Sequence, residues 1–171
     1  MNTSNQNVSF KGNKLTMVGS SLKVGDAFPN FKLVANDMSD LEKSAFSGKV
    51  MIIGAVPSLD TPVCQVETKR FNTEASELSD KVSLLFVSLD LPFAQKRFCG
   101  AEGIVRLVTA SDYKYRTFGE ATGTFIKEMG LLCRAIFVVD ATGKIAHVEY
   151  VPDISQEPQY EAALTAVRKL L

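Results

Sequence analysis

Cysteine is the residue type in this sequence that is best able to carry covalent chemistry. The chain contains three cysteines, Cys64, Cys99 and Cys133, and a single histidine. A cysteine thiolate is a nucleophile that can be oxidised to a sulfenic acid and then to a disulfide. The three cysteines are widely spaced and form no Cys-x-x-Cys pair. This spacing argues against a metal site and against a dithiol oxidoreductase.

Cys64 stands where a buried strand leads into a helix. Thr61 is suited to cap the helix N-terminus, Pro62 fits the first helical position, and Cys64 then lies in the first turn. The free amides and the partial positive charge of a helix N-terminus favour a thiolate over a thiol. Cysteine is also often a small buried hydrophobic residue. The strand-to-helix position makes a catalytic thiol the better interpretation of Cys64.

Cys99 follows a second strand, in a segment typical of a short helix that begins near Leu91 and is stopped by Gly100. This strand and helix meet at the same edge of the predicted sheet as those around Cys64. From the residues alone, Cys99 is either a resolving thiol or a buried structural cysteine.

Cys133 and Arg134 are neighbours in an apolar segment that reads as one strand over residues 131–139. Successive side chains of a strand point to opposite faces, so these two side chains should face apart. Cys133 is interpreted as a residue that fills the core. A charged side chain in so apolar a strand is costly unless it is paired or belongs to a site, and both interpretations of Arg134 stay open.

The elements that must position these residues are strands alternating with helices. This pattern predicts an α/β fold, with a mixed sheet flanked by helices and an N-terminal β-hairpin around Gly12-Asn13. The expected strands cover residues 31–35, 50–56, 82–89, 105–109, 132–140 and 144–151, and the last two form an antiparallel hairpin. The expected helices run from Thr61 to about Ser79, from Leu91 to Gly100, and from near Pro158 onward, the last with Tyr160, Leu164, Val167 and Leu171 at helical spacing.

Composition limits the classes of function. With 171 residues, 46% of them hydrophobic, a single domain over residues 1–171 is expected. Nineteen basic residues balance nineteen acidic ones, which argues against a nucleic-acid partner. No segment reads as a membrane span or a secretory signal. Few cysteines and no signal lead us to expect a cytoplasmic protein.

Three motifs resemble one known family. The run PSLDTPVC at residues 57–64, the block DLPFAQKRFCGAEG at 90–103 and the run LLCRA at 131–135 are similar to those of bacterial thiol peroxidases, the Tpx group of atypical two-cysteine peroxiredoxins. The resemblance extends from the N-terminal hairpin to the last helix, so it covers essentially the whole chain.

The resemblance implies a thioredoxin-like fold and a peroxidase that reduces hydrogen peroxide and organic hydroperoxides. It implies that Cys64 is the peroxidatic cysteine and Cys99 the resolving cysteine of the same subunit, with Pro57, Thr61 and Arg134 shaping the peroxide site. It also implies a homodimer that needs no cofactor, is recycled by thioredoxin and serves antioxidant defence. Because a disulfide needs α-carbons within about 7 Å, we expect one or both helix ends to unwind.

The sequence departs from the family pattern in three places. Pro62 stands where glycine is common, Lys69-Arg70 reverses the usual order of two basic residues, and Cys133 replaces a more usual alanine. The third cysteine could compete in thiol–disulfide exchange.

Two other functions remain open from the residues. Cys64 could serve a cysteine hydrolase with His147 as its base, although a single histidine in a strand is more often a structural residue. A redox sensor could form the same disulfide without turnover. The absence of a glycine-rich phosphate loop argues against a nucleotide cofactor.

Overall fold

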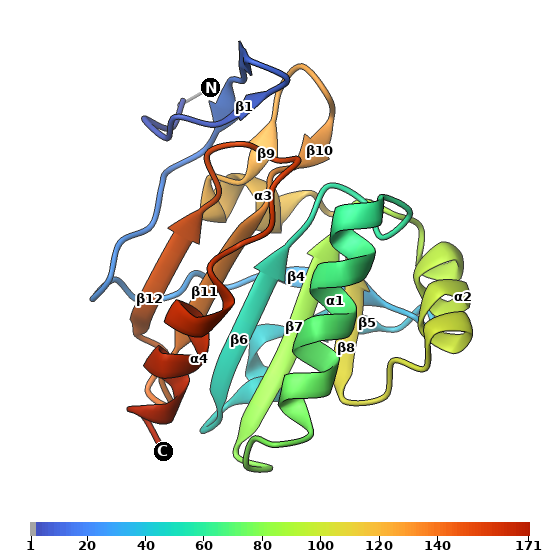
Figure 1. Cartoon of the computed structure of the whole chain (residues 1–171), viewed down its shortest axis with the longest axis vertical. Coiled ribbons are helices and arrows are strands. Elements are labelled where there is room, and N and C mark those ends of the chain that lie inside the picture. Colours follow the sequence, from blue (N-terminus) through green and yellow to red (C-terminus); the bar gives the residue numbers. More distant parts are fainter. Residues whose placement is uncertain (1–2) are drawn as a thin grey trace.

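The computed structural model describes residues 3–171, and its centre is a mixed sheet (Figure 1). The seven strands of this sheet, in spatial order, are β12 (Ile145–Tyr150), β11 (Ala135–Val139), β6 (Val50–Ala55), β7 (Val82–Ser88), β8 (Leu107–Ser111), β4 (Lys32–Ala35) and β5 (Asp40–Glu42). The pairs β6–β7 and β7–β8 are parallel, and the other neighbouring strands are antiparallel. The carboxyl ends of β6, β7 and β8 therefore meet at one edge of the sheet.

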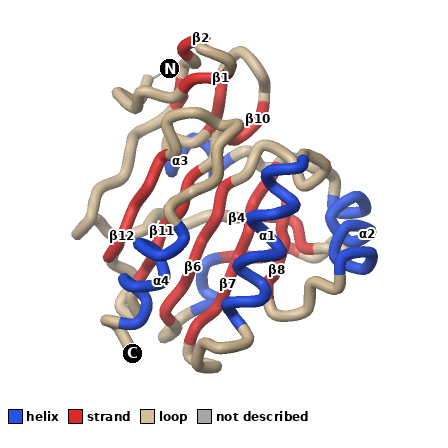
Figure 2. The backbone as a smooth tube through the Cα atoms, viewed as in Figure 1, coloured by secondary structure: helices blue, strands red, loops and turns tan. Residues whose placement is uncertain are grey.

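Helices cover both faces of this sheet (Figure 2). Helices α1 (Pro62–Ala75) and α4 (Tyr160–Arg168) lie on one face, α1 over β7 and β8 and α4 over β11 and β12. Helix α2 (Pro92–Glu102) packs against β8. The short helix α3 (Thr117–Thr122) contacts β4 and β9, and the 3₁₀ helix η1 (Lys43–Phe46) follows β5.

Short strands outside the large sheet form two smaller sheets. Strands β1 (Ser9–Phe10) and β2 (Asn13–Lys14) make the expected hairpin, and β3 (Met17–Val18), β9 (Phe125–Ile126) and β10 (Leu131–Leu132) form a three-stranded sheet. The last residues of the expected hairpin segment, in β3, pair with β9 and not with β1.

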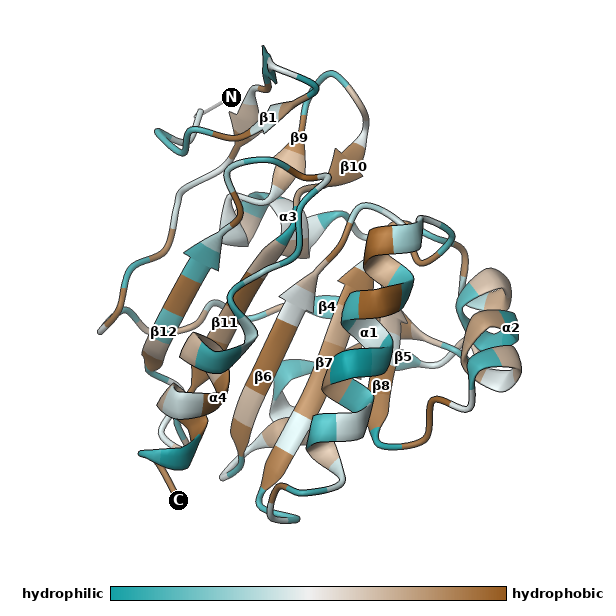
Figure 3. Ribbon diagram, in the orientation of Figure 1, coloured by the Kyte–Doolittle hydropathy of each residue, from teal (hydrophilic) through white to brown (hydrophobic). Residues whose placement is uncertain are grey.

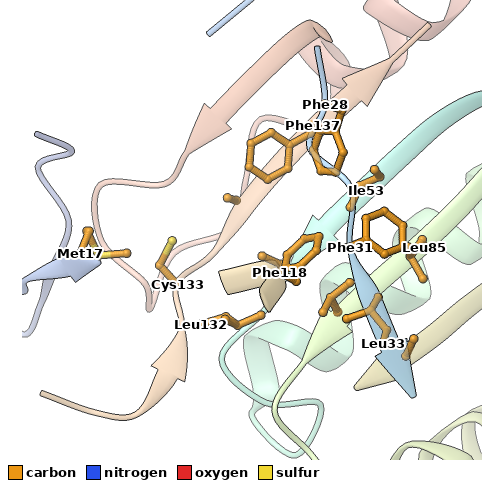
Figure 4. Close-up of a cluster of buried hydrophobic side chains, with 14 of the residues drawn as sticks. Met17, Phe28, Phe31, Leu33, Ile53, Leu85, Phe118, Leu132, Cys133 and Phe137 are labelled. Carbon is orange, nitrogen blue, oxygen red and sulfur yellow. The ribbon is translucent and has the colours of Figure 1, made fainter. Parts of the chain in front are cut away.

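Two hydrophobic clusters lie on opposite faces of the large sheet, because side chains alternate along each strand. Ile52 packs under α1 and α4 together with Phe71, Leu164 and Cys64. Ile53 packs into the other cluster (Figure 4), whose members include Met17, Phe28, Phe31, Phe118, Cys133 and Phe137. Burial on both faces explains why β6, β7 and β11 are predominantly hydrophobic in Figure 3, whereas α1 mixes hydrophobic and hydrophilic residues.

The predicted strands 31–35, 50–56, 82–89 and 144–151 are confirmed as β4, β6, β7 and β12, and so is the antiparallel hairpin of β11 and β12. The strand predicted at 105–109 is displaced to β8. The amides of Val105 and Arg106 donate instead to Oδ1 of Asn72 on α1, and the Val105 side chain is 83% exposed. The prediction of one domain over residues 1–171 stays a prediction, and residues 1 and 2 lie outside the described part.

The single strand predicted over 131–139 is broken at Cys133 and Arg134. The amide of Cys133 donates to the carbonyl of Thr124 at 2.7 Å, and the carbonyl of Arg134 accepts from the amide of Val151 at 2.9 Å. The residues before the break pair with β9, and those after it pair with β6 and β12. The segment therefore passes from the small sheet into the large one.

Helix ends differ most from the sequence prediction. Helix α1 ends at Ala75, because Ser76 turns its amide and hydroxyl back to the carbonyl of Thr73. Helix α2 continues through Gly100 and ends at Glu102, and its C-cap Gly103 has a left-handed φ of 65°. The last helix begins at Tyr160, and Leu171 is 56% exposed and lies outside its buried face.

Candidate active site

Cys64 lies in the first turn of α1, as the sequence predicts. Thr61 is the N-cap, Pro62 takes the first helical position, and the amide of Cys64 donates to Oγ1 of Thr61 at 3.4 Å. The side chain is completely buried at the carboxyl end of β6. The sulfur of Cys64 therefore lies at the positive end of the helix dipole.

Arg134 brings a second positive charge to the sulfur. Its Nη2 donates to Sγ of Cys64 at 3.3 Å. Its Nε and Nη2 also donate to the carbonyl of Ile154, at 3.2 and 2.9 Å, so the guanidinium group is held from a second side. Arg134 is 1% exposed, so water screens this charge little.

Glu67 completes this charged group and was missed in the sequence analysis. It is completely buried, and its Oε2 accepts from Nη1 of Arg134 in a buried ion pair. Burial raises the pKa of the Glu67 carboxyl to about 7, although the charge of Arg134 opposes this shift. The signal in the sequence was the spacing of three residues between Cys64 and Glu67, because residues i and i+3 of a helix share one face.

The loop between β6 and α1 is fixed by hydrogen bonds of its own. Pro57 is buried at its start. The carbonyl of Ser58 accepts from Oγ1 of Thr61 at 3.0 Å and from the amide of Thr61 at 3.2 Å. The hydroxyl of Thr61 therefore donates to Ser58 while accepting from Cys64, which sets the start of the helix.

Cys99 lies on α2 and is half-buried against the same hydrophobic cluster as Cys64. Its Sγ is 3.3 Å from Oγ1 of Thr109 on β8. All three cysteines are free thiols in this structure. The two sulfurs have different hydrogen-bond partners, Arg134 and Thr109, so this conformation is the reduced one in which they are held apart.

Cys133 is buried in the cluster on the other face of the sheet, as expected for a core residue. Burial raises the pKa of its thiol to about 12, so the thiolate form is scarce at neutral pH. Arg134 points to Cys64, so the two neighbours do face apart even though the strand is broken between them.

His147 does not support the hydrolase alternative. It lies on β12 in register with Val138, and burial lowers the pKa of its imidazole. Its buried Nε2 has no hydrogen-bond partner among residues 3–171, whereas the sulfur of Cys64 is bound by Arg134. A base must reach the proton that it removes, and His147 makes no such contact.

No group of three or more His, Cys, Asp or Glu side chains within residues 3–171 is placed to hold a metal ion. No helix in this part of the chain is both long and apolar enough to cross a membrane.

Comparison with known proteins identifies the family of this chain. Residues 23–164 match the family model described as Redoxin, and with the thioredoxin-like fold this match identifies a peroxiredoxin-type oxidoreductase. The chain belongs to the thiol peroxidase family. The thiol peroxidase of Oceanobacillus iheyensis is 48% identical over 95% of this chain and 99% of its own length. That of Bacillus subtilis is 44% identical over 96% of this chain and 98% of its own.

Solved structures agree on the fold. A peroxiredoxin-like protein from Aquifex aeolicus superposes with a TM-score of 0.90 at 42% identity, over 96% of each chain. A thiol peroxidase from Chromobacterium violaceum, 20% identical, has a TM-score of 0.85 over 95% of each chain and supports the fold alone.

Proposed function

We propose that this thiol peroxidase reduces hydrogen peroxide and organic hydroperoxides with Cys64 as its attacking thiol. The observation that carries the proposal is the hydrogen bond from Nη2 of Arg134 to Sγ of Cys64, 3.3 Å long, at the start of α1. Two sources of positive potential, a helix N-terminus and a buried guanidinium group, then stabilise the same thiolate. Cys133 packs in the cluster on the opposite face of the sheet, where burial disfavours its thiolate despite the charge of the neighbouring Arg134.

In the first step the thiolate sulfur of Cys64 attacks the terminal oxygen of the hydroperoxide. The O–O bond breaks, the sulfur keeps a hydroxyl group as a sulfenic acid, and the leaving oxygen takes up a proton as water or an alcohol. The cysteine is oxidised by two electrons and the peroxide is reduced by two. Arg134 stabilises the negative charge that develops on the leaving oxygen.

Pro57 and Thr61 shape the site around this step. Pro57 is buried at the end of β6 and limits water near the sulfur. Thr61 caps α1 and, when peroxide binds, holds it by a hydrogen bond from its hydroxyl group, which donates to Ser58 in the reduced form. The peroxide therefore competes with the Ser58 carbonyl for this hydroxyl group.

In the second step Cys99 resolves the sulfenic acid. Its thiol attacks the sulfur of Cys64, water leaves with the hydroxyl group, and an intramolecular disulfide forms. Both sulfurs must first leave their present partners, Arg134 and Thr109. Local unwinding near Cys64, Cys99 or both supplies this motion.

An external dithiol must then reduce the disulfide by exchange. Thioredoxin is the proposed reductant and the protein is proposed to act as a homodimer, both from the family resemblance. The proposed antioxidant role would be exercised in a reducing compartment such as the cytoplasm.

The proposal is tested by peroxide-dependent NADPH oxidation coupled through thioredoxin and its reductase. Turnover should be abolished in Cys64→Ser and strongly impaired in Cys99→Ser. Cys133→Ala is the matched control, because it removes a thiol that faces the cluster on the opposite side of the sheet. Oxidation of Cys64 without turnover in the intact protein would favour a redox sensor and contradict the proposal.

A further inference from the structure

Asp90 joins the two segments that carry the redox cysteines. It follows β7 and precedes α2, the helix of Cys99. Its Oδ1 accepts from Oγ of Ser58 at 2.6 Å, and its Oδ2 accepts from the amide of Leu59 at 2.8 Å. Figure 1 shows that α1 and α2 begin at the same end of the sheet, after β6 and β7. The carboxylate therefore bridges the loop before α1 and the junction before α2.

Asp90 is itself fixed from the side of the sheet. Its Oδ2 also accepts from Oγ of Ser88 at 2.7 Å, and its carbonyl accepts from Oγ of Ser111 at 2.5 Å. The buried side chain of Gln95 on α2 donates from Nε2 to Oγ of Ser88 and to the carbonyl of Ala110, both at 3.0 Å. The first turn of α2 is thus held to β7 and β8, and the hydroxyl group of Ser88 contacts both Gln95 and Asp90.

On the other side, the network reaches the reactive cysteine. Ser58 accepts from Thr61 through its carbonyl, and Thr61 accepts from the amide of Cys64. A continuous chain of hydrogen bonds therefore runs from Cys64 through Thr61 and Ser58 to Asp90. Carboxylate acceptors make the strongest hydrogen bonds of this kind, so Asp90 dominates the connection.

We propose that Asp90 is a positioning residue that acts as a clasp between the two cysteine segments and sets the rate at which Cys64 and Cys99 combine. The inference rests on the proposed function, because it concerns the second step of that cycle. With the clasp closed, Cys64 stays at Arg134 and Cys99 at Thr109. The disulfide forms only in molecules in which the bonds of Asp90 to Ser58 and Leu59 have opened.

The strength of the clasp then decides between two fates of the sulfenic acid. Cys99 can displace its hydroxyl group as water and form the disulfide. Alternatively, the sulfenate attacks a second hydroperoxide, gains an oxygen as a sulfinic acid and releases an alcohol or water. Only the first fate needs the clasp to open, so a weaker clasp should favour the disulfide over the sulfinic acid.

The experiment mixes reduced protein with excess organic hydroperoxide, quenches the mixture in acid and measures the disulfide and sulfinic forms by intact mass. The variants are Asp90→Ala and Ser58→Ala, the second removing one hydroxyl group from the clasp. The matched control is Asp140→Ala. Asp140 also accepts three hydrogen bonds, from Thr142 and Lys144, but it lies beyond the end of β11 that pairs with the start of β6, away from Cys64.

The ratio of disulfide to sulfinic acid should rise about tenfold in Asp90→Ala, as expected for losing hydrogen bonds to a charged acceptor. It should rise less in Ser58→Ala and stay unchanged in Asp140→Ala. An unchanged or lower ratio in folded Asp90→Ala, or in Ser58→Ala if the first variant fails to fold, would overturn the inference. If the unaltered protein forms no disulfide with peroxide, the proposed function itself has failed.

A second measurement uses the protein without substitution. Hydrogen exchange of the Leu59 amide is compared in the reduced and disulfide forms, because this amide donates directly to Asp90. The inference predicts that its protection is lost when the disulfide forms. Equal protection in both forms would mean that the clasp stays closed and would overturn the inference.

Discussion

Glu67 forms a buried ion pair with Arg134 one helical turn after Cys64. A buried ion pair gains its attraction at the cost of removing both charges from water. Here the desolvation of the carboxylate outweighs the attraction of Arg134, and the pKa of Glu67 is therefore raised to about 7. The pair is therefore better suited to orient Arg134 toward Cys64 than to stabilise the fold.

This residue gives a dependence of stability on pH. The folded-state pKa of Glu67 is about 7, above the ordinary value of 4.5, so between these pH values the folded protein binds more protons than the unfolded chain. The contribution of Glu67 to the free energy of unfolding should fall as the pH rises through this window. Glu67→Gln removes the titration and should flatten that part of the stability curve.

Urea unfolding of both proteins at several pH values measures this difference. His147 is present in both, so its own titration cancels from the comparison. Stability curves that stay parallel from about pH 4.5 to 7 would contradict the assignment of this titration to Glu67.

At the scale of elements, the site depends on where helices begin and end. The start of α1 was predicted correctly because Thr61, Pro62 and Cys64 are local signals that need no tertiary information. The end of α2 was predicted wrongly, because Gly100 and Gly103 are both plausible stops and only the second adopts a left-handed φ.

The two glycines of α2 allow a matched prediction. Gly103→Ala places a Cβ at a φ of 65° and should lower the free energy of unfolding by about 1 kcal/mol. Gly100→Ala adds a Cβ inside the helix, where no heavy atom lies within 4 Å, and should raise it by about 0.5–1 kcal/mol. Thermal or urea unfolding checks both signs, and equal effects of the two substitutions would contradict the observed helix end.

Contacts between distant elements explain what sequence reasoning missed. The break at Cys133 and Arg134 arises because the chain passes from one sheet to another. A continuous apolar segment in the sequence does not show such a change of sheet. Asp90 lies in the quoted family block, but its bonds to Ser58 and Leu59 follow only from the parallel pairing of β6 with β7. The three motifs can be recognised in the sequence, whereas the hydrogen bonds between them depend on the tertiary structure.

At the scale of the whole molecule, the sheet separates the two proposed redox cysteines from Cys133. Cys64 and Cys99 pack in the cluster under α1 and α4, and Cys133 packs in the opposite cluster (Figure 4). The order of the sheet thereby keeps the third thiol away from exchange in the folded state. We therefore expect that Cys133 does not compete with Cys99 for the disulfide with Cys64.

Substitutions of Cys133 should therefore change stability and leave turnover unaltered. Cys133→Ser places a hydroxyl group in an apolar core and should cost about 1–3 kcal/mol of folding free energy. Cys133→Ala should cost less, on the order of 1 kcal/mol, because it leaves a small cavity without a new polar group. Unfolding and peroxidase assays of both variants are the check, and a loss of turnover at full folding would contradict the separation.

The most direct test of the proposed mechanism is the oxidation of reduced protein by one equivalent of an organic hydroperoxide, followed by peptide mapping under non-reducing conditions. We expect one intramolecular disulfide between Cys64 and Cys99, with Cys133 recovered as a free thiol. A disulfide that contains Cys133, or an unmodified Cys64 after the peroxide has been consumed, would contradict it.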